Sequence, residues 1–163
     1  MKRITCSALI LLVSVFCFAN AGITFANSAS RSAVDEDNAR EAVIRDLARD
    51  FSDRTLTIFV AIDGKPASDQ FIKRFRDLKN PVKRDPKTEG FSTDNRTEHL
   101  QNNNTKEPGV ILNVEKLHWI SNSEIEMDGS YNCGAFCSGG SAFRVIRKAG
   151  KWVAHSVGPM WAS

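Results

Sequence analysis

The chain has 163 residues, of which 22 are Lys or Arg and 19 are Asp or Glu, so its formal net charge is +3 at pH 7. This length suits one domain. A charge so close to neutral argues against a general affinity for nucleic acid or for an anionic membrane surface. We therefore expect no nucleic-acid partner.

The first 21 residues have the three-part layout of a secretory signal peptide, with two basic residues, an apolar run over about residues 8–19, and then small residues. We expect cleavage after Ala21, or as late as residue 29. The apolar run is shorter than the roughly 20 residues of a membrane span. We therefore expect a secreted or periplasmic protein with no stable membrane span after cleavage, and 20 basic against 19 acidic residues leave the mature chain a net charge of +1.

Hydrophobic periodicity predicts two helices and a strand in the first part of the mature chain. Residues 35–51 repeat apolar side chains every four positions behind an acidic first turn, which is typical of an amphipathic helix. Residues 55–62, TLTIFVAI, predict a buried strand that ends at an Asp-Gly turn. Ser68 is the expected N-cap of a short helix within residues 68–79. The apolar stripe of this second helix consists of Phe71, Ile72, Phe75 and Leu78.

Residues 80–108 are polar and contain three prolines, so we expect a long loop with a short strand or turn near Phe91. A loop of this length inside a compact domain usually carries function. The basic sequence KRFRDLKNPVKRDPK, residues 73–87, leads into it. This sequence fits either a solvated helix face or an anion-binding patch.

The chain after Pro108 has the patterns of consecutive strands. Residues 109–120 place apolar side chains at alternate positions and then change phase, which predicts a bulge near Glu115 and Lys116. Residues 124–132 alternate strictly between apolar and polar. Two further strands are expected within residues 141–157, and three or four antiparallel strands in a meander account for this part of the chain.

The order of elements is helix, strand, helix, long loop and meander. It predicts an α+β fold in which one or two N-terminal helices pack on a curved antiparallel sheet, in a single domain over residues 35–163. The cone-shaped cystatin-like and nuclear-transport-factor-like folds have a similar order of elements. That analogy does not fix a function.

Residues 109–153 contain a strand that ends in Tyr-x-Cys-Gly, followed by a glycine-rich turn and a Gly-Lys-Trp hairpin, and the chain closes with MWAS. This part of the chain resembles a family of small secreted bacterial proteins that have these same motifs and no known activity. Weaker similarity extends to the sequence VAIDGKPASDQFIKRF, so that the resemblance covers about half of the chain. It implies a shared fold and no catalytic residue.

Removal of the signal peptide leaves two cysteines, Cys133 and Cys137, which in an exported chain predict a disulfide. Their spacing is not the Cys-x-x-Cys of thiol oxidoreductases. We expect residues 138–140 to form a turn, so no helix follows to lower a thiol pKa. If Tyr131 lies opposite Phe143 in an antiparallel hairpin, the pairing of the two strands would end at Cys133, and Cys137 would lie at the apex of the loop.

A disulfide would stiffen the loop and display Phe136 between Gly134 and Ser138. An apolar side chain on a rigid turn is a suitable anchor for binding. We therefore expect a binding module that contacts a protein partner through this loop, with no cofactor and no catalytic residue.

Two alternative predictions are a zinc site and a small-ligand or hydrolytic pocket. The cysteines could bind zinc together with His118 and His155, although an oxidising compartment favours the disulfide. A small-ligand or hydrolytic pocket in the concavity of a cone-like sheet would use these histidines with Tyr131 and Asp128. That pocket requires these side chains to converge and the histidines to lie within about 10 Å of each other.

The acidic row Glu124, Glu126 and Asp128 could supply paired carboxylates for glycoside hydrolysis or ligands for calcium. The simpler interpretation is a solvated strand face. In that case Arg144 and Lys148 on the neighbouring strand would pair with the acids.

Overall fold

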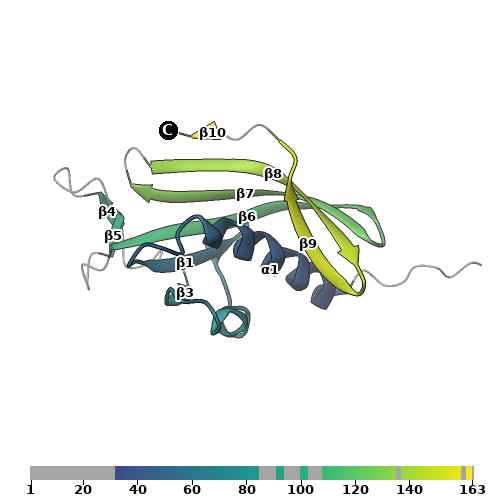
Figure 1. Cartoon of the computed structure of the whole chain (residues 1–163), viewed down its shortest axis with the longest axis horizontal. Helices are drawn as coiled ribbons and strands as arrows, with labels where there is room; N and C mark the ends of the chain where they lie inside the picture. The colour runs from purple at the N-terminus through teal and green to yellow at the C-terminus, as the bar shows by residue number, and fades with distance from the viewer. Residues whose placement is uncertain are drawn as a thin grey trace, which may run out of the picture.

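The computed structural model describes residues 32–84, 91–93, 100–102, 108–134, 137–158 and 161–162. The expected signal peptide and Phe136 lie outside these residues. The elements in chain order are α1 (Ala33–Arg49), β1 (Thr57–Ile62), β2 (Lys65–Pro66), α2 (Asp69–Ile72), the 3-10 helix η1 (Lys73–Phe75), β3 (Val82–Arg84), β4 (Phe91–Thr93), β5 (Leu100–Asn102), β6 (Pro108–Ser121), β7 (Glu124–Gly134), β8 (Cys137–Lys148), β9 (Lys151–Ser156) and β10 (Trp161–Ala162) (Figure 1).

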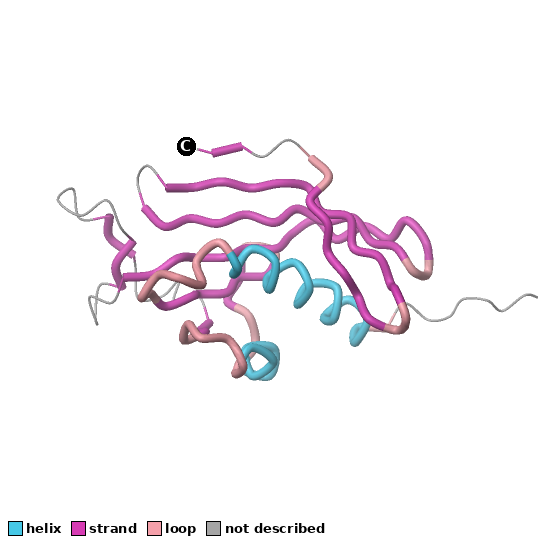
Figure 2. Tube along the Cα trace, viewed as in Figure 1, coloured by secondary structure: helices cyan, strands magenta, loops and turns pink. Residues whose placement is uncertain are grey.

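The described strands form one sheet, and α1 lies across one of its faces, so the α+β class is confirmed (Figures 1 and 2). The main path of the sheet runs β10-β8-β7-β6-β1-β2. β9 pairs with the C-terminal half of β8. β6, β7, β8 and β9 form the expected antiparallel meander. The sheet as a whole is mixed, because β1 runs parallel to both β3 and β6. The long connection from β1 to β6 makes this parallel pairing possible.

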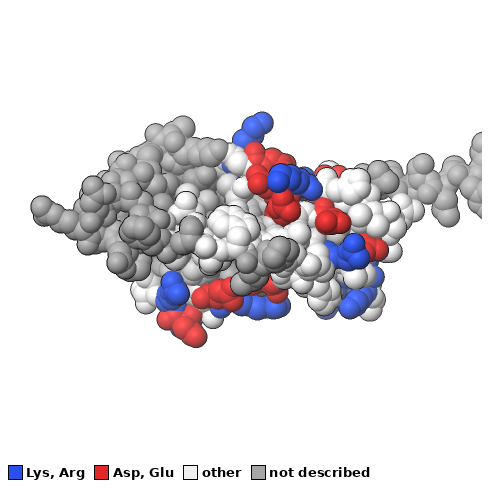
Figure 3. All heavy atoms as spheres, turned by 90° about the horizontal axis from the view of Figure 1, so that it is seen from above, with Lys and Arg blue, Asp and Glu red and all other residues white. Residues whose placement is uncertain are grey.

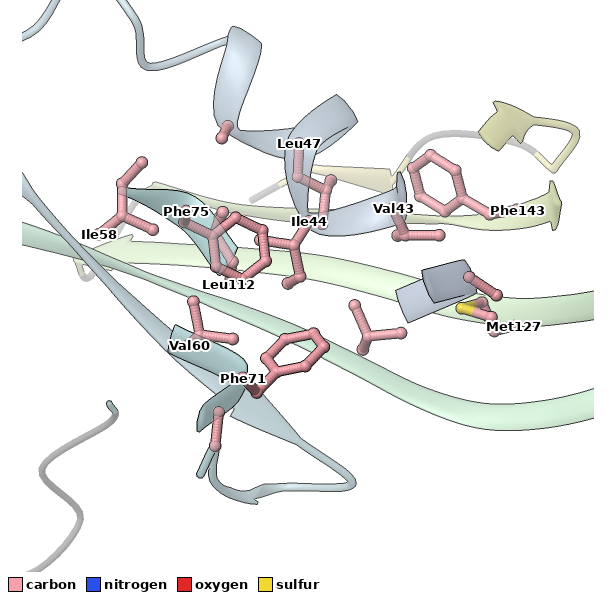
Figure 4. Close-up of a cluster of buried hydrophobic side chains, with 14 of the residues drawn as sticks. Val43, Ile44, Leu47, Ile58, Val60, Phe71, Phe75, Leu112, Met127 and Phe143 are labelled. Carbon is pink, nitrogen blue, oxygen red and sulfur yellow. The ribbon is translucent and has the colours of Figure 1, made fainter. Parts of the chain in front are cut away.

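The core lies between α1 and the sheet. Ser32 caps α1 by accepting a hydrogen bond from the backbone N–H of Asp35 at 3.1 Å. The apolar stripe of the helix, Val43, Ile44 and Leu47, then packs on residues of the inner face of the sheet (Figure 4). Sheet residues of this cluster that are fully or almost fully buried include Val60, Leu112, Val114, Ile125, Met127 and Phe143.

The predicted details of several elements are confirmed. β6 and β7 shift register between Glu115 and His118, where the bulge was expected, and Lys116 there has a positive φ of 56°. Ser68 caps α2 through the N–H of Phe71. The second helix is shorter than expected and tightens into η1. The long segment after it contains β4 at Phe91, as expected, and also β3 and β5.

Two tryptophans hold the first turn of α1 against the meander. The indole N–H of Trp152 donates to Asp35, and that of Trp119 donates to Glu36, each at 3.2 Å. The two rings pack edge to face with centroids 5.8 Å apart. These contacts fix where the N-terminus of the helix sits on β6 and β9.

Arg45 joins α1 to η1 and to the segment that follows η1. Its guanidinium binds both carboxylate oxygens of Asp77 at 2.9 Å and the carbonyl oxygen of Arg74 at 2.8 Å. It also forms an i,i+4 pair with Glu41. The hydrogen bond from Arg45 holds the pKa of Asp77 below its ordinary value of 3.8, and Asp77 in turn raises the pKa of Arg45.

This pair predicts a pH-dependent contribution to stability. A carboxyl whose pKa is lower in the folded chain stabilises the fold above its unfolded pKa, and the contribution is lost as the pH falls through the folded pKa. We expect the free-energy difference between wild type and Asp77→Asn to be constant above pH 3.8 and to shrink below it. Urea unfolding at a series of pH values measures this difference. The exposed Asp53, which forms no ion pair with a described residue, provides the control Asp53→Asn. A wild-type to Asp77→Asn difference that stays constant with pH would contradict the prediction.

Candidate functional site

The β7–β8 hairpin is closed by a disulfide between Cys133 and Cys137, as predicted, with the two Cα atoms 5.1 Å apart. Cys133 is 3% exposed and belongs to the core cluster, and Cys137 packs against that cluster. The disulfide therefore attaches the end of the hairpin to the core.

The predicted register of this hairpin is wrong. Tyr131 lies opposite Gly139, and Phe143 lies opposite Met127. The ladder continues to the pair Gly134 and Cys137, so Cys137 begins β8 and does not lie at the apex of the loop.

Residues 138–140, expected as a turn, are part of strand β8. Their glycines are required by close packing on both faces of the strand. A Cβ at Gly139 would lie 2.6 Å from the hydroxyl oxygen of Tyr131, and one at Gly140 would lie 2.9 Å from the indole nitrogen of Trp161.

The residues expected to bind a partner lie around the disulfide. Gly134 is buried and has a φ of 147°, which favours glycine. Ser138 is half-buried at the start of β8. Phe136, the expected anchor, lies outside the described residues. The structure thus places the base of the predicted loop but does not describe its tip.

A hollow opens beside the disulfide, at the end of the sheet where β1 and β6 begin. One part of it has a volume of about 450 Å³ and is lined by Arg54, Thr55, Leu56, Pro108, Gly109 and Cys133. An adjoining part of about 280 Å³ shares four of these residues and adds Thr57, Lys79, Asn80 and Pro81. We call both parts together the disulfide-end hollow. Its lining comes from segments far apart in the sequence, and no motif in the sequence indicates it.

Strand pairing and hydrogen bonds between distant segments hold the walls of the hollow. Parallel pairing sets Thr57 of β1 opposite Gly109 of β6, which brings Leu56 and Pro108 to the same end of the sheet. The buried Asn80 donates to the carbonyl oxygens of Arg54 and Leu56, at 2.8 and 3.1 Å. Buried polar groups that are hydrogen-bonded in this way rigidify the backbone around them.

A second concavity, which we call the basic groove, lies between the α2–η1 segment and β3. Its volume is about 530 Å³. Its charged lining residues are Asp69, Lys73, Arg76, Lys79 and Lys83. It meets the disulfide-end hollow at residues 79–81, which line both. Of the basic sequence at residues 73–87, the groove is lined by the cations Lys73, Arg76, Lys79 and Lys83.

The structure does not bring together the residues of the alternative pocket. His118, Glu126, Arg144 and His155 form one row across β6, β7, β8 and β9. Three strand spacings separate the histidines by roughly 14 Å. Tyr131 lies on the opposite face of the sheet, where its ring packs edge to face on Phe51 at 5.4 Å.

The acidic row is neutralised by ion pairs, as expected for a solvated strand face. Arg144 lies 3.1 Å from Glu124 and 3.9 Å from Glu126. Asp128 pairs at 2.9 Å with Lys116, not with Lys148, and its hydrogen bond raises the pKa of Lys116. Seen from above the view of Figure 1, acidic and basic side chains lie next to one another on the surface of the molecule (Figure 3).

We expect the double variant Cys133→Ala/Cys137→Ala to lower the free energy of unfolding by about 2 kcal/mol, because the disulfide closes a short loop of the unfolded chain. Urea unfolding of the oxidised wild type and of the double variant measures the difference. The intact mass under non-reducing conditions should be lower than the reduced mass by two hydrogen atoms. Two freely titratable thiols in the native protein would contradict the prediction.

Over the ranges that the structure describes, no three His, Cys, Asp or Glu residues are grouped so that they could hold a metal ion. The helices in these ranges are also too short or too polar to cross a membrane. No protein-family model, no curated protein and no solved structure matches this chain.

Proposed function

We propose that this chain is an exported binding module that contacts a protein partner with the end of the sheet at which the disulfide closes the β7–β8 hairpin. The observation that carries the proposal is the disulfide-end hollow, which has a mainly apolar lining and includes Cys133. Binding energy in protein interfaces is concentrated where a large side chain fills such a concavity.

The rigidity of this region supports the same function. The disulfide and the hydrogen bonds of Asn80 hold the lining in place before a partner arrives. A preformed site loses little conformational entropy on binding. Phe136, the anchor expected from the sequence, comes two positions after the buried Gly134 in the chain.

Site-specific photocrosslinking tests the proposal. A photoreactive amino acid replaces Thr55, an exposed residue of the hollow, or Asn122, an exposed residue of the β6–β7 turn. In Figure 1 this turn lies at the opposite end of the sheet. The full chain is expressed in its source organism, and envelope and culture-supernatant fractions are irradiated. We expect one discrete protein adduct from position 55 and none from position 122.

Reconstitution with the purified partner provides the second half of the test. Thr55→Trp should fill the hollow and weaken binding about tenfold or more, a typical effect at a central contact. Asn122→Trp adds the same side chain at the other end and should leave binding unchanged. The proposal fails if no adduct forms, or if both positions give the same adducts.

N-terminal sequencing of the exported protein tests cleavage after Ala21.

A further inference from the structure

The basic groove concentrates positive charge in a chain that is otherwise close to neutral. Lys73 and Arg76 are exposed along one wall, Lys79 lies at the junction with the hollow, and Lys83 comes from the other wall. The one carboxylate in the lining, Asp69, lies 3.8 Å from Arg84, which balances its charge.

The arginines of the neighbouring helix α1 differ, because they already have partners. Arg40, Arg45 and Arg49 each form an ion pair with an acid of the described chain. Lys73 and Arg76 form no ion pair with any residue in the described ranges. No acid of these ranges therefore neutralises their charges.

The basic groove and the apolar hollow form one continuous surface. Lys79, Asn80 and Pro81 line both concavities. Asn80 is 7% exposed and fixed by two hydrogen bonds, so the wall between them is rigid. A ligand that fits this surface has negative charges at one end and an apolar group at the other.

We propose that this surface binds an extended acidic segment of the protein partner, with carboxylates along the basic groove and one apolar side chain in the disulfide-end hollow. This inference rests on the proposed function and specifies the chemistry of the partner. The opposite charges steer the segment into the groove, and the apolar contact holds it there.

The shape of the surface favours a peptide segment over a membrane. The cations line a concave groove between the α2–η1 segment and β3, whereas a lipid surface requires a flat or protruding face. The large apolar side chains exposed in the described ranges are Val34, Ile120, Val157 and Trp161. They line neither the groove nor the hollow, so this surface presents no side chain for insertion into lipid.

Selection from a library of random linear peptides displayed on phage tests the inference with the full mature chain. We expect the enriched peptides to carry an excess of Asp and Glu and at least one large apolar residue. The double variant Lys73→Glu/Arg76→Glu should bind the best peptide about tenfold more weakly or worse, because two favourable charge contacts become repulsive. Binding to the wild type should weaken as salt is added.

Lys148→Glu/Lys151→Glu is the matched control, because it makes the same change of charge in the β8–β9 hairpin and should leave binding unchanged. Enriched peptides without an acidic excess, or equal binding by the two double variants, would overturn the inference. Vesicles that contain phosphatidylglycerol form a parallel arm. The inference would also be overturned if acidic peptides are not enriched and the wild type binds these vesicles while Lys73→Glu/Arg76→Glu does not. The groove would then be a membrane-binding site.

Binding of the two variants to the crosslinked partner distinguishes a failure of this inference from a failure of the proposed function on which it rests. If Thr55→Trp weakens that complex while Lys73→Glu/Arg76→Glu does not, the binding module stands and the acidic segment is wrong. If neither variant affects the complex, both proposals fail. If both variants weaken it and the partner's contacting segment is acidic, both are supported.

Discussion

Phe75→Ala should lower the free energy of unfolding by about 3–5 kcal/mol, as is usual when a buried aromatic ring is removed from a core. Phe75 is 1% exposed and packs edge to face on Phe71, with ring centroids 5.4 Å apart. The guanidinium of Arg45 lies 5.3 Å from the centre of the Phe75 ring. Figure 4 shows this ring within the cluster beneath α1. The measurement is urea unfolding followed by circular dichroism.

The effect should extend to the basic groove, because Phe75 ends η1 and lines that groove. A single 3-10 turn has little stability of its own and depends on tertiary contacts. Gln70→Ala on the exposed side of α2 is the control and should change stability by less than about 0.5 kcal/mol. Similar losses in the two variants would show that Phe75 does not anchor this segment.

Gly129→Leu is the second substitution for which we expect a large loss, of about 1–3 kcal/mol or more from overpacking. A Cβ at position 129 would lie 2.7 Å from the ring of Phe143 and 2.9 Å from a methyl group of Val43. Both neighbours are buried, so neither can move away freely. Gly129 thus sets how closely α1 approaches β7. The loss is measured by urea unfolding.

A double-mutant cycle separates this contact from the general cost of adding a side chain to a strand. Gly129→Ala and Val43→Ala are made singly and together. We expect the double variant to be less destabilised than the sum of the single variants, because removal of the valine methyl groups makes room for the new Cβ. Additive losses would contradict the proposed contact.

Local patterns in the sequence predicted the elements that depend on local physics. Alternation in residues 124–132 identified the inner face of β7, the change of phase near Lys116 located the bulge, and Ser68 marked the start of α2. These features follow from side-chain periodicity and from capping. Each can be recognised within about ten residues of sequence.

Non-local contacts account for what the sequence did not predict. Gly139 and Gly140 look like turn residues in sequence, but Tyr131 and the distant Trp161 require their small size within a strand. The direction of β1 depends on its pairing with β6, some fifty residues away. The hollow combines residues from both of these strand ends with Asn80 and Cys133, so no single stretch of the sequence contains its signature.

The tryptophan pair at the start of α1 gives the protein a built-in optical reporter. Of the three tryptophans in the chain, Trp119 and Trp152 donate to the first turn of the helix, whereas Trp161 is 55% exposed on β10. Separation of α1 from the meander would move two indoles into water and leave the third almost unchanged. Intrinsic emission of a Trp161→Phe variant would therefore follow helix docking alone, and quenching of Trp161 would follow the C-terminal strand.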